Sequence, residues 1–129
     1  MFKALKITFL IFLFGFISCE KNPGLGGTST IDGIVTFQEV FNGEVTSEYP
    51  AQEERVYIIY GDSTNVYDDE MRTDFNGRFE FNNLTKGVYT IYSFSSCQLC
   101  PSGKEAIFRE LEVSENNSSV NCPEIKLIK

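Results

Sequence analysis

The chain has 129 residues, with 11 basic and 18 acidic side chains, so its formal net charge is −7. This acidity argues against nucleic acid or an anionic membrane surface as a partner, because both are bound through Lys and Arg. Histidine is absent, which removes the commonest general base near neutral pH and the commonest metal ligand. Serine triads, zinc–histidine sites and c-type haem attachment are therefore excluded. We expect no catalytic residue, no metal and no cofactor.

The N-terminal 18 residues have the pattern of a signal peptide. Lys3 and Lys6 precede ITFLIFLFGFI, an uncharged run of eleven residues. A membrane-spanning helix needs about 20 apolar residues, so this run is too short to span. Small Ser18 supplies a cleavage position directly before Cys19. The stretch resembles a bacterial lipoprotein signal, with Phe16 at the position where Leu is usual.

That resemblance implies a lipid on Cys19 and cleavage after Ser18. Each buried methylene is worth about 0.8 kcal/mol, so two or more acyl chains anchor a protein stably. The chain would then lie in the cell envelope, in the outer membrane of a Gram-negative bacterium. Residues 19–30 contain Pro, three Gly and hydroxyl side chains but almost no apolar ones, and they predict a flexible tether. Residues 31–129 form the remaining domain.

The first half of this domain reads as short strands separated by turns. Residues 31–41 alternate in polarity, with Ile31, Gly33, Val35 and Phe37 on the inward face. Asn42-Gly43 predicts a type I′ hairpin, since that turn needs positive φ at both central residues. Residues 56–60 are apolar on both faces, which is typical of a central strand. Residues 70–74 are more polar and predict an edge strand.

The second half continues the same pattern. Phe79 and Phe81 are predicted to point inward, and residues 88–94 form a long strand. Residues 106–113 and 119–128 are expected to close the chain as a hairpin across the sequence SENN. About seven strands with turns between them predict an all-β fold, a single antiparallel β-sandwich.

Residues 73–92, TDFNGRFEFNNLTKGVYTIY, resemble the signature of carboxypeptidase regulatory-like, or transthyretin-like, β-sandwich domains. The matching residues are Thr73, Asp74, Gly77, Phe79, Phe81, Leu84, Gly87, Tyr89 and Ile91. Asp74 can accept backbone donors in the turn, Gly77 supplies a positive φ, and the aromatic residues fill the space between two sheets. The resemblance implies a domain that binds or presents other parts and is not itself an enzyme.

Three cysteines follow the anchor: Cys97 and Cys100 in CQLC, and Cys122. A C-x-x-C pair outside the cytoplasm suggests a redox dithiol, half of a metal site or a local disulfide. No amphipathic helix follows Cys97 to lower its pKa, and a zinc site needs a fourth ligand. The expected final hairpin keeps Cys122 beyond the disulfide limit of about 7 Å between Cα atoms. We therefore predict a Cys97–Cys100 disulfide and a packed Cys122. A thiol-disulfide or metal-handling protein is the alternative.

The acidic stretch around residue 68 contains Asp62, Asp68, Asp69 and Glu70. Such carboxylates could hold Ca²⁺. Adjacent residues in a strand point to opposite faces, however, so a solvated acidic edge that discourages strand pairing is the favoured interpretation.

Four tyrosines, Tyr57, Tyr60, Tyr67 and Tyr92, cannot all point inward by parity. A contiguous outward patch would mark a binding face, but scattered single tyrosines are the favoured arrangement. The sequence thus predicts a lipid-anchored, non-enzymatic module that binds an envelope protein or a glycan. A carbohydrate-binding module, which needs an exposed aromatic platform, is a further alternative.

Overall fold

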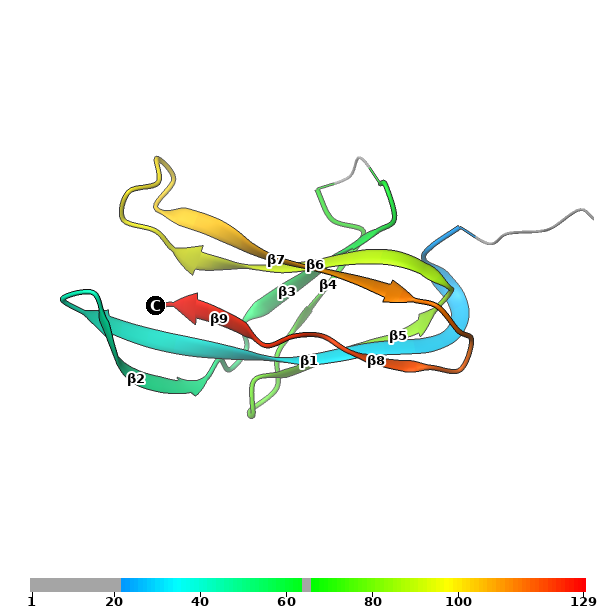
Figure 1. The fold of residues 1–129 in the computed structure, drawn as a ribbon, viewed down its shortest axis with the longest axis horizontal. Coiled ribbons are helices and arrows are strands. Elements are labelled where there is room, and N and C mark those ends of the chain that lie inside the picture. The colour runs from blue at the N-terminus through cyan, green and yellow to red at the C-terminus, as the bar shows by residue number, and fades with distance from the viewer. Residues whose placement is uncertain (1–21, 64–65) are drawn as a thin grey trace, which may run out of the picture.

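The computed structural model describes residues 22–63 and 66–129, in which two β-sheets pack face to face and no helix occurs (Figure 1). The strands are β1 (Leu25–Phe41), β2 (Glu44–Pro50), β3 (Arg55–Tyr60), β4 (Asp69–Arg72), β5 (Arg78–Leu84), β6 (Gly87–Ser96), β7 (Lys104–Val113), β8 (Ser119–Asn121) and β9 (Ile125–Ile128). The expected all-β sandwich is confirmed. The predictions for the signal peptide and for Cys19 lie outside the described residues. Within the described ranges, no helix is long and apolar enough to cross a membrane.

Strand β1 organises the five-stranded sheet. One of its edges pairs antiparallel with β5 and then with β2. The two partners meet at Val35, whose N–H donates to Gly77 O at 2.8 Å and whose carbonyl accepts from Ala51 N at 3.0 Å. The N–H and C=O of one strand residue point to the same side, so β5 and β2 lie end to end. The opposite edge of β1 pairs with β8 and β9.

The second sheet has four strands in the order β4-β3-β6-β7. The central position of β3 and the edge position of β4 agree with the polarity of their sequences. Strands β6 and β7 form the most extensive pairing, which runs from Gly87 opposite Val113 to Ser96 opposite Lys104. This hairpin projects along the long axis of the molecule (Figure 1).

The expected closing hairpin is wrong. After β7 the chain crosses to the other sheet, where β8 and β9 pair parallel with β1 and not with β7. The sandwich is therefore mixed, not fully antiparallel. Ile125 and Leu127 are fully buried in β9, so this crossover closes one side of the core. It also satisfies the backbone groups on the second edge of β1, as in the 2.9 Å bond from Thr30 N to Ser118 O.

The predicted tether over residues 19–30 is too long. β1 begins at Leu25, and the preceding Gly24 is buried. Gly24 N donates to Tyr89 Oη at 2.9 Å, and Gly24 O accepts from Thr85 N at 2.9 Å. Thr85 Oγ1 donates to Asn22 O, also at 2.9 Å. Backbone hydrogen bonds hold this segment, which is why its shortage of apolar side chains was misleading.

The core lies between the two sheets and is built from the predicted inward faces. Its fully buried apolar side chains include Ile31, Val35, Val56, Ile58, Tyr89, Ile91, Val113, Ile125 and Leu127. Phe79 and Phe81 point into it, while the alternating residues Arg78 and Glu80 are exposed. Burial of this kind is worth about 25 cal/mol per Å² of apolar surface, so the alternation within each strand fixes which face is buried.

Candidate functional site

The residues of the 73–92 motif build the fold, and Asp74 and Phe79 also line a pocket with Asp32 and Met71. Asp74 Oδ1 accepts hydrogen bonds from Asn76 N at 2.8 Å and from Arg78 N at 2.9 Å. Gly77 has φ of 74°, and a Cβ there would lie 2.4 Å from Val35 O. Gly87 is the first residue of β6, and Phe79, Phe81, Leu84 and Tyr89 belong to the core.

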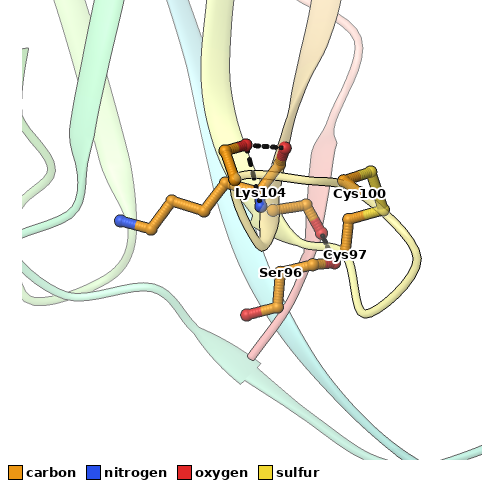
Figure 2. The surroundings of a disulfide bond; sticks show 6 residues. Ser96, Cys97, Cys100 and Lys104 are labelled. Atoms are coloured by element: carbon orange, nitrogen blue, oxygen red, sulfur yellow. Dashed lines mark hydrogen bonds between the residues drawn. A yellow bond between two sulfur atoms is a disulfide. The ribbon is translucent and has the colours of Figure 1, made fainter.

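Cys97 and Cys100 form the predicted disulfide, with a Cα–Cα distance of 5.3 Å (Figure 2). It lies in the loop between β6 and β7, which Cys97 N closes by donating to Gly103 O at 2.9 Å. Cys122 is free and buried, and burial raises the pKa of its thiol to about 11. The pairing is therefore right, although the hairpin from which it was argued does not exist. No helix follows Cys97 in the described chain to activate it.

One group of three candidate metal donors occurs in the described residues: Cys97, Cys100 and Glu105. Both sulfurs of this group are engaged in the disulfide. The carboxylates near residue 68 form no such group. Asp68 is not a solvated edge residue, because its Oδ2 accepts from Tyr60 N at 2.7 Å and its Oδ1 from Ser63 Oγ at 3.1 Å. These bonds hold the loop that precedes β4.

Aromatic side chains gather on the outer face of the four-stranded sheet. Tyr57 of β3 lies opposite Tyr92 of β6, and Tyr92 lies opposite Phe108 of β7. Side chains on directly opposed residues share one face of a sheet. Because Val56, Ile58 and Ile91 point into the core, these three rings point away from it. The register of three strands thus produces a transverse row of aromatic rings.

Two further rings extend this row. Phe94 of β6 has its centroid 5.7 Å from those of both Tyr57 and Tyr92, in T-shaped contacts. Tyr67, in the loop before β4, lies 5.0 Å from Tyr57. The remaining centroid distances are 4.9 Å between Tyr57 and Tyr92 and 5.2 Å between Tyr92 and Phe108. We call these five residues, Tyr57, Tyr67, Tyr92, Phe94 and Phe108, the aromatic face.

Tyr92 is the centre of the aromatic face. Its side chain is 3% exposed, whereas Phe108 is 55%, Tyr67 43% and Phe94 40% exposed. Burial, with a smaller contribution from Tyr57 and Tyr67, raises the pKa of Tyr92. Its hydroxyl donates to Val66 O at 2.7 Å, which fixes the loop that carries Tyr67. The surrounding rings therefore rest on a rigid base and present their outer surfaces to solvent.

The expectation of scattered tyrosines is wrong, since three of the four belong to one contiguous cluster. Parity indicates only that the four tyrosines cannot all point inward, and the cluster depends on the register between β3, β6 and β7. Tyr60 is the exception: it packs against Tyr89 at a centroid distance of 5.9 Å and belongs to the inner side. Phe94 and Phe108 are not among the site residues predicted from the sequence. Phe94 lies between two serines in β6, whereas Phe108 follows Ile107 in β7, so alternation marks only Phe94.

Charged side chains border the aromatic face. Glu70 of β4 lies opposite Tyr57, and Glu110 of β7 lies opposite Thr90. Arg55 begins β3 two residues before Tyr57 and therefore points to the same side. A ligand on the rings would meet hydrogen-bonding groups around its rim. Exposed rings bordered by polar groups are suited to reversible binding.

Fold and site together define a β-sandwich domain with an exposed aromatic face. No protein-family model and no curated protein matches the chain. Among solved structures, it is similar to a Pseudomonas aeruginosa protein described as a "putative carbohydrate binding protein". The two are 17% identical with a TM-score of 0.48, over 82% of this chain and 91% of the other. This similarity concerns the fold alone.

Proposed function

We propose that this protein is a lipid-anchored, non-enzymatic module of the bacterial cell envelope that binds glycans through its aromatic face. The observation that carries the proposal is the cluster of five contacting rings on one outer sheet face, three of them 40–55% exposed. Exposed contiguous apolar surface marks interaction sites. The resemblance of residues 73–92 to carboxypeptidase regulatory-like domains supports a binding role.

The composition of the aromatic face favours a sugar as its ligand. A pyranose ring has an apolar C–H surface and a polar rim of hydroxyl groups. Phe108 and Phe94 offer ring surfaces on which the C–H face can pack. Glu110 offers an acceptor and Arg55 a donor for the hydroxyl groups. Tyr and Phe side chains have few rotatable bonds, so they lose little entropy on binding. A cluster of exposed rings with a charged rim therefore suits a glycan better than a hydrophobic peptide.

Substitution of Phe108 tests the face. We expect Phe108→Ala to weaken retention on immobilised polysaccharide about tenfold, because loss of one stacking ring costs about 1–2 kcal/mol. The measurement is affinity gel electrophoresis of the purified protein against a panel of neutral and acidic polysaccharides. Phe75→Ala is the matched control, since Phe75 is 77% exposed and is not part of the aromatic face. Equal retention of both variants and the unmodified protein would overturn the proposed site.

The anchor is tested separately. We expect Cys19→Ser to abolish incorporation of radiolabelled palmitate and to move the protein from the membrane to the soluble envelope fraction. Two or more acyl chains provide essentially all of the expected membrane affinity. Ser18→Ala, which keeps a small residue before the cysteine, should leave labelling intact. Labelling that survives Cys19→Ser would contradict lipidation at this residue.

A further inference from the structure

Two arginines stand side by side at one border of the aromatic face. Arg55 of β3 and Arg72 of β4 are directly opposite each other in the antiparallel ladder. Both are exposed, and Val56 and Met71, their neighbours in the strands, face the core. The guanidinium groups therefore project from the same outer sheet face as Tyr57. Phe94, 40% exposed, contacts Tyr57 near this border.

This arrangement is unfavourable for the isolated domain. Like charges directly opposite each other in a sheet are destabilising. Among residues 22–63 and 66–129 the structure has one ion pair, between Lys126 and Glu48, so neither arginine is paired with a carboxylate there. Arg72 Nη1 donates to the Glu53 backbone carbonyl at 3.3 Å. Within the described residues, the Arg55 guanidinium group forms no hydrogen bond.

Two acidic residues lie beside the pair: Glu54 precedes Arg55 in the chain, and Glu70 is two residues from Arg72 on β4. Among the described residues neither forms an ion pair with an arginine. Burial raises the pKa of Glu54, and Lys104, Arg72 and Lys129 partly oppose this effect. The Glu54 carboxylate therefore interacts with three cationic side chains and not with Arg72 alone. Glu70 lies opposite Tyr57 on the same strand as Arg72, whereas Glu110 lies on β7 at the other edge of the sheet. Arg55 and Arg72 are thus a local concentration of positive charge on a chain whose net charge is −7.

We propose that the aromatic face binds an acidic glycan, with the carboxylate of a uronic-acid-type sugar held between Arg55 and Arg72 and its ring packed on Phe94. The proposal rests on the glycan-binding function proposed above and names its ligand class. Planar guanidinium groups match a carboxylate in bidentate geometry. A bound carboxylate would relieve the repulsion between the two arginines. Because the rest of the chain is acidic, general attraction to a polyanion does not account for such binding.

The test compares polygalacturonate, dextran sulfate and dextran as carboxylate, sulfate and neutral probes in affinity gel electrophoresis. We expect the full chain to bind polygalacturonate at least about tenfold more tightly than dextran. The double variant R55Q/R72Q should lose this preference. Higher salt should weaken binding of the unmodified protein to polygalacturonate by as much as the double substitution does. R78Q is the matched control, because Arg78 is an exposed arginine on the other sheet. Thermal unfolding checks that each variant remains folded.

The possible failures are distinguishable. Equal retention on polygalacturonate and dextran, with loss of both in Phe108→Ala, would overturn the acidic-glycan assignment and leave glycan binding standing. Stronger retention on dextran sulfate than on polygalacturonate would overturn the carboxylate in favour of a sulfate ester. An equal effect of R78Q and R55Q/R72Q would place the interaction outside the aromatic face. No retention on any probe or on the wider panel would remove the glycan function itself.

Discussion

Replacement of Gly77 by alanine is expected to lower the free energy of unfolding by about 3 kcal/mol. Two costs contribute. The residue has φ of 74°, a left-handed conformation that costs an L-residue about 1–2 kcal/mol. The added Cβ would also lie 2.4 Å from Val35 O and 3.2 Å from Ala51 N. These backbone atoms join β5, β1 and β2, so the turn cannot move away without disturbing that junction.

Gly43→Ala separates the two costs. Gly43 has φ of 79°, but nothing lies within 4 Å of a Cβ built there. We expect this control to lose only about 1–2 kcal/mol, the backbone contribution. Urea unfolding of both variants, followed by circular dichroism, gives the comparison. Equal losses would show that the close approach to Val35 contributes nothing.

Tyr89→Phe is expected to destabilise the domain by about 2 kcal/mol, since it removes a buried hydroxyl and leaves its partners unsatisfied. That hydroxyl donates to Thr85 O at 2.7 Å and accepts from Gly24 N at 2.9 Å. The loss of stability should be largest in the segment that precedes β1, which these hydrogen bonds hold in place. Hydrogen exchange at Gly24 and Thr85 is therefore expected to accelerate more than exchange in the core strands.

Tyr49→Phe is the matched control for this variant. Tyr49 Oη makes one long, exposed contact, to Glu39 Oε1 at 3.4 Å. Its removal should change the free energy of unfolding by less than about 0.5 kcal/mol. If Tyr89→Phe behaved in the same way, the hydroxyl at residue 89 would not be what secures the segment before β1.

Most of the strands could be predicted from local signals in the sequence. Asn42 and Gly43 adopt φ of 51° and 79° in the hairpin between β1 and β2, as the type I′ preference requires. Alternation placed Phe79 and Phe81 inward because a strand buries every second residue. These features depend on neighbours in the sequence and need no knowledge of tertiary pairing.

What the sequence could not give depends on pairing between distant segments. The SENN stretch signals a turn after β7, but a turn does not specify which sheet receives the next strand. β8 and β9 follow β1 because Ile125 and Leu127 complete the core on that side. In the same way, alternation shows that the tyrosines cannot all point inward, yet only the register with β6 and β7 brings Tyr57 to Tyr92 and Phe108.

If Cys19 carries the proposed lipid, the docking of Asn22 and Gly24 determines how far the domain stands from the membrane. Consecutive Cα atoms are about 3.8 Å apart, so Cys19 and Asn22 are separated by at most about 11 Å. In a chain lipidated on Cys19, the end of the sandwich near Gly24 would stay close to the headgroups. Arg55 lies at the far end of β3 from Tyr60, whose ring faces Gly24. The border of the aromatic face that carries Arg55 and Arg72 would then point away from the membrane, where a glycan can approach it.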